Sequence, residues 1–135
     1  MPVLLDTGIL YAYYDRSDDW HKRALPLLRG ERGGLIVPAP VIPEVDHLLG
    51  QRLGVKARLA FYRGLSEGHL FVADLPRELY PRILELNLQF ADLDLGFVDA
   101  SVAALSESLE LRRVATTDRR HFGALAGPLS LELLP

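Results

Sequence analysis

Apolar residues follow two different periods along this chain, and the two periods alternate. Short runs of consecutive apolar residues, typical of buried strands, occur at 3–5, 35–37, 70–73 and 113–116, with a further candidate at 129–133. Between them, apolar residues recur at helical spacing, which predicts helices at 7–14, 17–30, 43–53, 55–66, 76–90, 96–109 and 121–125. This alternation predicts an α/β fold, with a central mostly parallel sheet of four to five strands covered by helices on both faces.

Local signals refine the start of two helices. Ser17 is the candidate N-cap of the second helix, with Asp18 and Asp19 in its first turn, where negative charge is favourable. Gly30 is expected to end that helix. Pro43 opens the next one, because proline is tolerated in the first turn of a helix.

Length and composition narrow the class of protein. With 135 residues, 49% of them hydrophobic, the chain has the size of a single domain spanning 1–135 and enough apolar material for a core. It has no cysteine, which excludes disulfides, zinc sites built on cysteine and thiol nucleophiles. No apolar run approaches the roughly 20 residues that span a bilayer, and no basic leader precedes an apolar segment at the start. We therefore expect a soluble cytoplasmic protein.

The charge balance is less decisive. A net charge of -3 argues mildly against nucleic-acid binding, which favours a basic surface. A cluster of carboxylates that binds metal ions would itself supply several of these negative charges. All basic residues other than Lys22 and Lys56 are arginines, which suit bidentate contacts with phosphate, although a simple compositional bias explains them equally well.

Four acids occupy the positions where an α/β fold gathers its chemistry. Asp6 directly follows the first strand, and Asp118 follows the strand at 113–116. Glu44 lies in the first turn of the helix after the second strand, and Asp99 lies near the start of the helix before 113–116. Because chemistry gathers at the carboxyl ends of parallel strands, we expect these side chains to converge on one edge of the sheet.

Each acid also has an ordinary structural explanation. Asp6 would cap a helix and Asp118 would fit a turn. Glu44 and Asp99 would simply favour helix N-termini. The set is more informative than its members, because clustered like charges repel one another unless a cation neutralises them. Carboxylate oxygens suit Mg²⁺, for which Mn²⁺ can substitute, and the fitting reaction is hydrolysis of a phosphodiester.

The same residues carry a resemblance to a known family. Four motifs occur in order along the chain: VLLDTGILYAYYDRSDDWH, VPAPVIPEVDHLL, LGFVDASVAALSESLEL and VATTDRRHFGAL. They contain an Asp-Thr pair at Asp6, an acid at Glu44, an acid at Asp99 and a closing Thr-x-Asp-x-x-His-Phe pattern that starts at Thr116. Over nearly its whole length, the chain resembles the PIN-domain nucleases, and within them the VapC-type toxins of toxin–antitoxin pairs.

The resemblance implies a three-layer α/β/α sandwich and Mg²⁺-dependent endoribonuclease activity on RNA. It assigns the roles of catalytic residue and metal ligand to the same four acids: Asp6, Glu44, Asp99 and Asp118. It also implies a homodimer, and a small antitoxin partner whose C-terminal segment occupies the active-site groove.

Residues beside the motifs have weaker assignments. Thr7 and Thr116 would place hydroxyls next to the acids, either as supports for them or in ordinary hydrogen bonds at a strand end. Asp94 is expected to cap the helix that carries Asp99 rather than to bind metal. His121 is expected to pack or hydrogen-bond within its short helix, because metal-dependent hydrolysis needs no histidine base.

Candidates for contacts with RNA are the basic residues that flank the last motif, namely Arg112, Arg113, Arg119 and Arg120. For each of them a solvated or salt-bridged surface is the alternative. The aromatic residues near the start, Trp20 among them, are the kind that stack on bases, although packing in the core or in a dimer is the favoured explanation.

Other functions fit less well. A haloacid-dehalogenase phosphatase needs a second aspartate two residues after its nucleophile, where this chain has Gly8. A receiver domain needs a late lysine, and none follows Lys56. A PIN-like scaffold would have no use for four acids, which leaves a catalytically weak RNA-binding or RNA-processing module as the alternative to a ribonuclease.

Overall fold

The computed structural model describes residues 1–31 and 33–135, and within them five strands alternate with seven α-helices. The strands are β1 (Val3–Leu5), β2 (Leu35–Pro38), β3 (Phe71–Ala73), β4 (Arg113–Ala115) and β5 (Glu132–Leu134). The helices are α1 (Thr7–Tyr14), α2 (His21–Gly30), α3 (Val41–Arg52), α4 (Val55–Ser66), α5 (Tyr80–Gln89), α6 (Gly96–Leu109) and α7 (His121–Leu129). Short 3-10 helices at Arg77–Leu79 and Ala91–Leu93 flank α5, so the helix predicted for 76–90 is divided. No helix in the described part of the chain is long and apolar enough to cross a membrane.

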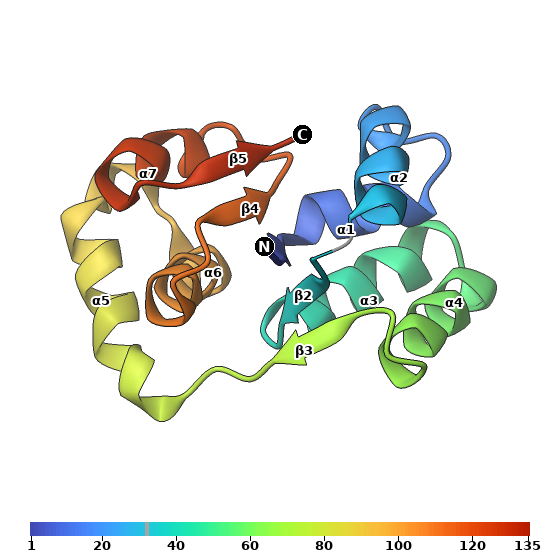
Figure 1. The fold of residues 1–135 in the computed structure, drawn as a ribbon, viewed down its shortest axis with the longest axis horizontal. Helices are drawn as coiled ribbons and strands as arrows, with labels where there is room; N and C mark the ends of the chain where they lie inside the picture. Colours follow the sequence, from blue (N-terminus) through green and yellow to red (C-terminus); the bar gives the residue numbers. More distant parts are fainter. Residues whose placement is uncertain (32) are drawn as a thin grey trace.

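The sheet is parallel throughout, with the strand order β3-β2-β1-β4-β5. In the central strand β1, Leu4 pairs with Ile36 of β2 on one side and with Val114 of β4 on the other. Helices α1 to α4 lie on one face of the sheet and α5 to α7 on the other (Figure 1). The predicted three-layer α/β/α sandwich with a parallel sheet is therefore confirmed.

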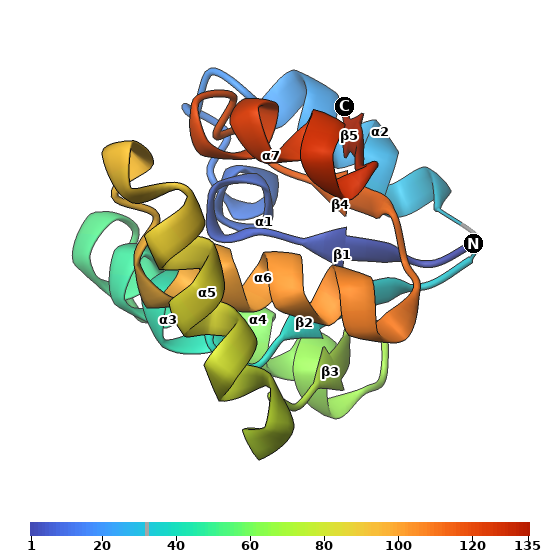
Figure 2. The same ribbon diagram turned by 90° about the vertical axis from the view of Figure 1, so that its left-hand side faces the viewer.

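The core explains why the apolar run at the start of the chain becomes the central strand. Val3, Leu4 and Leu5 are fully buried, because helices cover both faces of β1. Helix α6 lies across one of these faces (Figure 2), and its residues 100–106 are all buried. Burial of β1 fixes the position of the first residue after it, Asp6.

The prediction that Ser17 caps a helix is wrong. Helix α2 begins only at His21 and has no side-chain N-cap. Two aspartates form tight turns in the preceding loop instead: Asp15 Oδ1 accepts the Ser17 N–H at 2.9 Å, and Asp18 Oδ1 accepts the Trp20 N–H at 2.9 Å. An aspartate that bonds the backbone two residues ahead competes with helix formation, so the loop extends through 15–20.

The C-terminal elements are also shifted from the prediction. Helix α7 runs to Leu129 rather than to 125, and the last strand begins at Glu132. Leu125 and Leu129 are both buried and lie four residues apart, so the apolar stripe of the helix continues past the predicted end. Ser130 then ends the helix in the left-handed region, with φ of 56°.

Candidate active site

Four separate segments bring acids to the carboxyl ends of the strands. Asp6 joins β1 to α1, and Asp118 lies three residues beyond β4. Glu44 and Asp99 lie in the first turns of α3 and α6. Besides burial, the charges of Asp99 and Asp118 raise the pKa of Asp6. Burial likewise raises the pKa of Asp99, and the charges of Asp118 and Glu44 add to it. The structure thus brings all four predicted acids into one electrostatic cluster.

Asp6 is the most buried member of this cluster, with 4% of its surface exposed. Its Oδ2 accepts a hydrogen bond from the Thr116 hydroxyl at 2.8 Å, whereas its Oδ1 has no hydrogen-bond partner among the described residues. Burial raises the pKa of Asp6 to about 7, with a further increase from Asp99, while the Thr116 hydrogen bond lowers it. A buried carboxylate oxygen without a partner is costly, and a bound cation would satisfy it.

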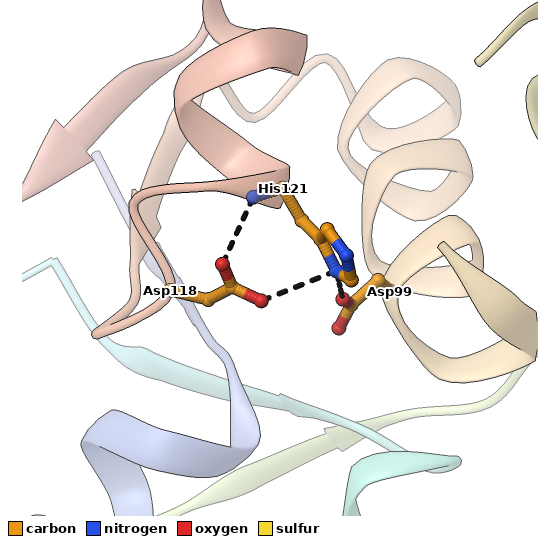
Figure 3. A group of neighbouring side chains, drawn as sticks. All are labelled: Asp99, Asp118 and His121. Atoms are coloured by element: carbon orange, nitrogen blue, oxygen red, sulfur yellow. Dashed lines mark hydrogen bonds and ion pairs between the residues drawn. The ribbon is translucent and has the colours of Figure 1, made fainter. Parts of the chain in front are cut away.

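His121 lies between two of the acids (Figure 3). Its Nδ1 is 2.6 Å from Asp99 Oδ2 and 3.2 Å from Asp118 Oδ2. The hydrogen bond to Asp99 raises the pKa of His121, so the imidazolium form is favoured and offsets part of the negative charge. Ligand atoms of these three residues all lie within 4.8 Å of one another, so one metal ion could contact both acids, with His121 as a further ligand only in its neutral form.

The loop from 116 to 121 holds Asp118 in place. The Thr116 Oγ1, which donates to Asp6, also accepts the Asp118 N–H at 2.9 Å. Asp118 Oδ1 accepts the His121 N–H at 2.9 Å, so it caps α7 while Oδ2 lies toward the imidazole (Figure 3). Asp118 can therefore cap the helix and take part in the acidic cluster at the same time, because a different carboxylate oxygen serves each role.

Glu44 is connected to the cluster through Thr7. The Thr7 hydroxyl donates to Glu44 Oε1 at 2.6 Å across the gap between α1 and α3. Pro43 does not displace the acid, because α3 begins at Val41 and Glu44 still lies in its first turn. Glu44 is the exposed member of the set, which places it at the rim of the site.

The donor set fits a hard divalent cation. All four acids supply carboxylate oxygens, the ligands that Mg²⁺ and Mn²⁺ prefer, and the chain has no thiolate to favour a softer metal. The Oδ1 of Asp6, which has no hydrogen-bond partner among the described residues, is free to bind such a cation. Besides burial, the charges of neighbouring acids raise the pKa of Asp6 and Asp99.

Comparison with known proteins identifies the fold family. Residues 3–128 match the family model of the PIN domain. The chain belongs to the PIN-domain family. This PIN domain is 30% identical over 123 residues to Ribonuclease VapC26 of Mycobacterium tuberculosis, with 91% of each chain covered.

Two solved structures share the fold of this PIN domain. The crystal structure of Mycobacterium tuberculosis VapC20, described as a sarcin–ricin loop cleaving toxin, has a TM-score of 0.82 at 20% identity, covering 90% of this chain and 94% of that one. The crystal structure of FitAcB from Neisseria gonorrhoeae has a TM-score of 0.66 at 18% identity, covering 98% of this chain and 96% of that one.

Of the four arginines predicted to contact RNA, two lie elsewhere in this PIN domain. Arg113 is at the amino end of β4, on the opposite edge of the sheet, and its guanidinium binds both carboxylate oxygens of Glu31 at 3.0 and 3.1 Å. Arg112 donates to the Leu129 carbonyl at 2.9 Å. Arg119 and Arg120 are exposed and directly follow Asp118, on the side of the acids.

The prediction that Asp94 caps α6 is wrong. Asp94 is exposed in the left-handed region with φ of 51°, and it makes no side-chain cap. The Asn87 side chain of α5 takes this role, since its Oδ1 accepts the Gly96 N–H at 3.0 Å and its Nδ2 donates to the Ile83 carbonyl at 2.9 Å. Asn87 thereby ties α5 to the first turn of α6, which carries Asp99.

Sequence reasoning also missed the place of His121, which it expected to serve its own helix alone. The available signal was the Asp118-x-x-His121 spacing, because residues three apart at a helix start lie on the same side.

A hollow of about 650 Å³ near the end of α1, lined by Tyr13, Tyr14 and Leu35 among others, includes none of the four acids.

Proposed function

We propose that this PIN domain is a divalent-metal-dependent endoribonuclease, with Mg²⁺ as the ion and Mn²⁺ as a substitute, acting as the toxin of a toxin–antitoxin pair. The observation that carries the proposal is the buried Asp6 in a cluster of four acids, whose Oδ1 has no hydrogen-bond partner in the described part of the chain. The identity with Ribonuclease VapC26 over 91% of the chain supports RNA as the substrate.

The four acids divide into two groups in this mechanism. Asp6, Asp99 and Asp118 would hold the cation, which supplies Lewis-acid stabilisation of charge that develops on a phosphodiester. The hydroxyl of Thr116 orients the Asp6 carboxylate. It also accepts a hydrogen bond from the Asp118 N–H, which fixes the position of Asp118 relative to Asp6. Glu44, held by Thr7 at the exposed rim, lies where substrate and solvent reach the site.

Cleavage of a mixed RNA by the purified chain tests the proposal. We expect cutting with Mg²⁺ or Mn²⁺, none with EDTA, and none in Asp6→Asn or Asp99→Asn, since an amide keeps the shape but loses the charge. Asp94→Asn is the matched control, because Asp94 is exposed, lies outside the cluster, and asparagine tolerates its left-handed backbone. Full activity in Asp6→Asn would show that the site is assigned wrongly.

A catalytically weak RNA-binding or RNA-processing module is the alternative role. Mn²⁺ binding measured by calorimetry, without cleavage of any RNA, would favour it. The toxin role is tested by expressing the chain in bacteria with and without a neighbouring small gene. Growth arrest relieved by that gene product would identify the antitoxin.

We also propose that the domain forms a homodimer through α5. Tyr80, Leu84 and Leu88 lie on one stripe of this helix and are 53%, 61% and 69% exposed, and Phe97 of α6 packs edge-on against Tyr80. A second copy of this surface would bury the stripe, as in isologous dimers. Sedimentation should show a dimer that Leu88→Glu dissociates, and a monomeric wild-type chain would overturn the proposal.

A further inference from the structure

Two arginines approach the indole ring of Trp20, beside the acidic site. The Cζ atom of Arg23 is 3.8 Å from the centre of the indole ring, and that of Arg119 is 5.4 Å from it. Both distances are within the range of roughly 6 Å for cation–π attraction. Arg119 directly follows Asp118, so these side chains lie next to the candidate active site. Trp20, Arg23 and Arg119 are called the Trp20 cluster below.

In the described part of the chain, the two guanidinium groups differ in what holds them: Arg119 is bound to a main-chain oxygen, and Arg23 makes no polar side-chain contact. Among the residues that the structure describes, neither Arg23 nor Arg119 forms an ion pair with a carboxylate side chain, and Arg119 donates one N–H to the Pro135 carbonyl at 2.6 Å. Two nearby acids are engaged in the loop, where Asp15 and Asp18 each accept a backbone N–H. These bonds leave the carboxylates charged, and Asp19 beside Trp20 is exposed, but residues 15–23 and 119–120 together carry five Lys or Arg and three Asp, so this part of the surface is positive on balance.

Stacking on an indole suits an arginine that binds phosphate. A guanidinium that meets the ring with its face keeps its in-plane N–H donors free, and these match phosphate oxygens. The ring also restricts the side chain before binding, which lowers the entropy cost of the contact. Exposed cations nearby in sequence, Lys22 and Arg120, add to the positive charge.

We propose that the Trp20 cluster binds the phosphate backbone of single-stranded RNA as it leaves the acidic site, with Trp20 as the residue that positions both arginines. The inference rests on the proposed ribonuclease function and names the surface that holds its substrate. Cations at this place offset the repulsion between four carboxylates and a polyanion. Arg112 and Arg113 do not contribute here, because they lie at the amino end of β4, on the opposite edge of the sheet from the acids, and Arg113 is paired with Glu31.

Fluorescence anisotropy of a short labelled single-stranded RNA tests this surface, with Asp6→Asn in every sample to prevent cleavage. Adding Arg23→Gln or Arg119→Gln should weaken binding about 3- to 10-fold at about 50 mM salt, and should reduce the slope of log K against log salt by about 0.7 each. Arg29→Gln is the matched control, since it removes the same charge from the far end of α2 and should weaken binding less than about 2-fold. Equal effects of Arg23→Gln and Arg29→Gln would overturn the proposal.

The positioning role of Trp20 needs a separate comparison. Trp20→Leu should weaken binding as much as an arginine variant without changing the net charge, and Trp20→Phe should recover part of the loss because it keeps a ring face. Thermal unfolding should show that both variants are folded. Equal binding by the leucine and phenylalanine variants would exclude a ring-based role.

Cleavage distinguishes this inference from the proposed function. In the otherwise wild-type chain, Arg119→Gln should raise KM several-fold and leave kcat nearly unchanged. If the chain cleaves RNA with an unchanged KM, the Trp20 cluster is wrong and the ribonuclease stands. If RNA binds through the cluster but is never cut, the cluster stands and the nuclease assignment fails. Absence of any RNA binding overturns the cluster.

Discussion

At the scale of single residues, the Thr116 hydroxyl connects two of the acids in the candidate active site. It is fully buried, donates to Asp6 Oδ2 and accepts the Asp118 N–H, so one oxygen serves two acids. The Thr7 backbone also acts on the Asp6 carboxylate, but Thr116 is the one side chain among the described residues that hydrogen-bonds to it. The relative position of Asp6 and Asp118 thus depends on a neutral, buried side chain.

Thr116→Val should therefore impair catalysis while preserving the shape of the core. The variant leaves Asp6 and the Asp118 N–H without a partner, so we expect cleavage to fall about 10- to 100-fold and the free energy of unfolding to fall by about 1–3 kcal/mol. RNA cleavage across a Mg²⁺ titration and urea unfolding measure the two effects. Thr117→Val, one residue along, is the control, and equal losses in both variants would contradict this role.

At the scale of elements, the start of α6 is held from outside the helix. Asn87 bonds to both Ile83 of its own helix and Gly96 of α6, and it takes the place that a capping acid would have. Asn87→Ala should lower the free energy of unfolding by about 1 kcal/mol. It should also weaken Mn²⁺ binding, measured by calorimetry, because Asp99 lies in the released turn. Gln89→Ala, at the exposed end of α5, should change neither quantity.

The contact between α1 and the loop after β4 leaves no room for a side chain. A Cβ added at Gly8 would lie 2.1 Å from Thr117 Oγ1, whereas one added at Gly123 of α7 meets nothing within 4 Å. Gly8→Ala should displace the loop that carries Asp118 and reduce RNA cleavage at least about 10-fold. Gly123→Ala should leave cleavage intact and raise the free energy of unfolding by up to about 1 kcal/mol. Unchanged cleavage in Gly8→Ala would show that the loop adapts freely.

The elements also show what a sequence can reveal. Apolar runs predicted β1 and β4, and a parallel sheet necessarily brings the residues after them, Asp6 and Asp118, to the same edge. The partners of His121 and Asn87 were not predictable in this way, because they depend on how two helices meet in space. Ser17 was misjudged because the aspartates before and after it compete for the backbone, and that competition is decided locally by geometry.

At the scale of the whole molecule, the acidic cluster makes the stability of the fold depend on pH. The pKa of Asp6 is raised to about 7 by burial first and by Asp99 second, and the pKa of His121 is raised by its bond to Asp99. Both groups bind a proton more tightly in the folded chain than in the unfolded one. Their stabilisation is therefore present at low pH and lost as pH rises, for Asp6 between its ordinary pKa of 3.8 and about 7.

The metal-free protein should consequently be less stable at about pH 8 than at about pH 5, by on the order of 3 kcal/mol. Carboxylates whose pKa is lowered, such as Glu31, are already ionised across this pH range, so they do not change the direction of this difference in stability. Urea unfolding in EDTA measures the difference, and Asp6→Asn should flatten it because the amide does not titrate. Mn²⁺ should restore stability at about pH 8 in the wild type but not in Asp6→Asn, since a ligand that binds only the folded state shifts the equilibrium toward it. A wild-type chain whose stability rises between these pH values without metal would show that the cluster is neutralised from within, by groups other than a cation.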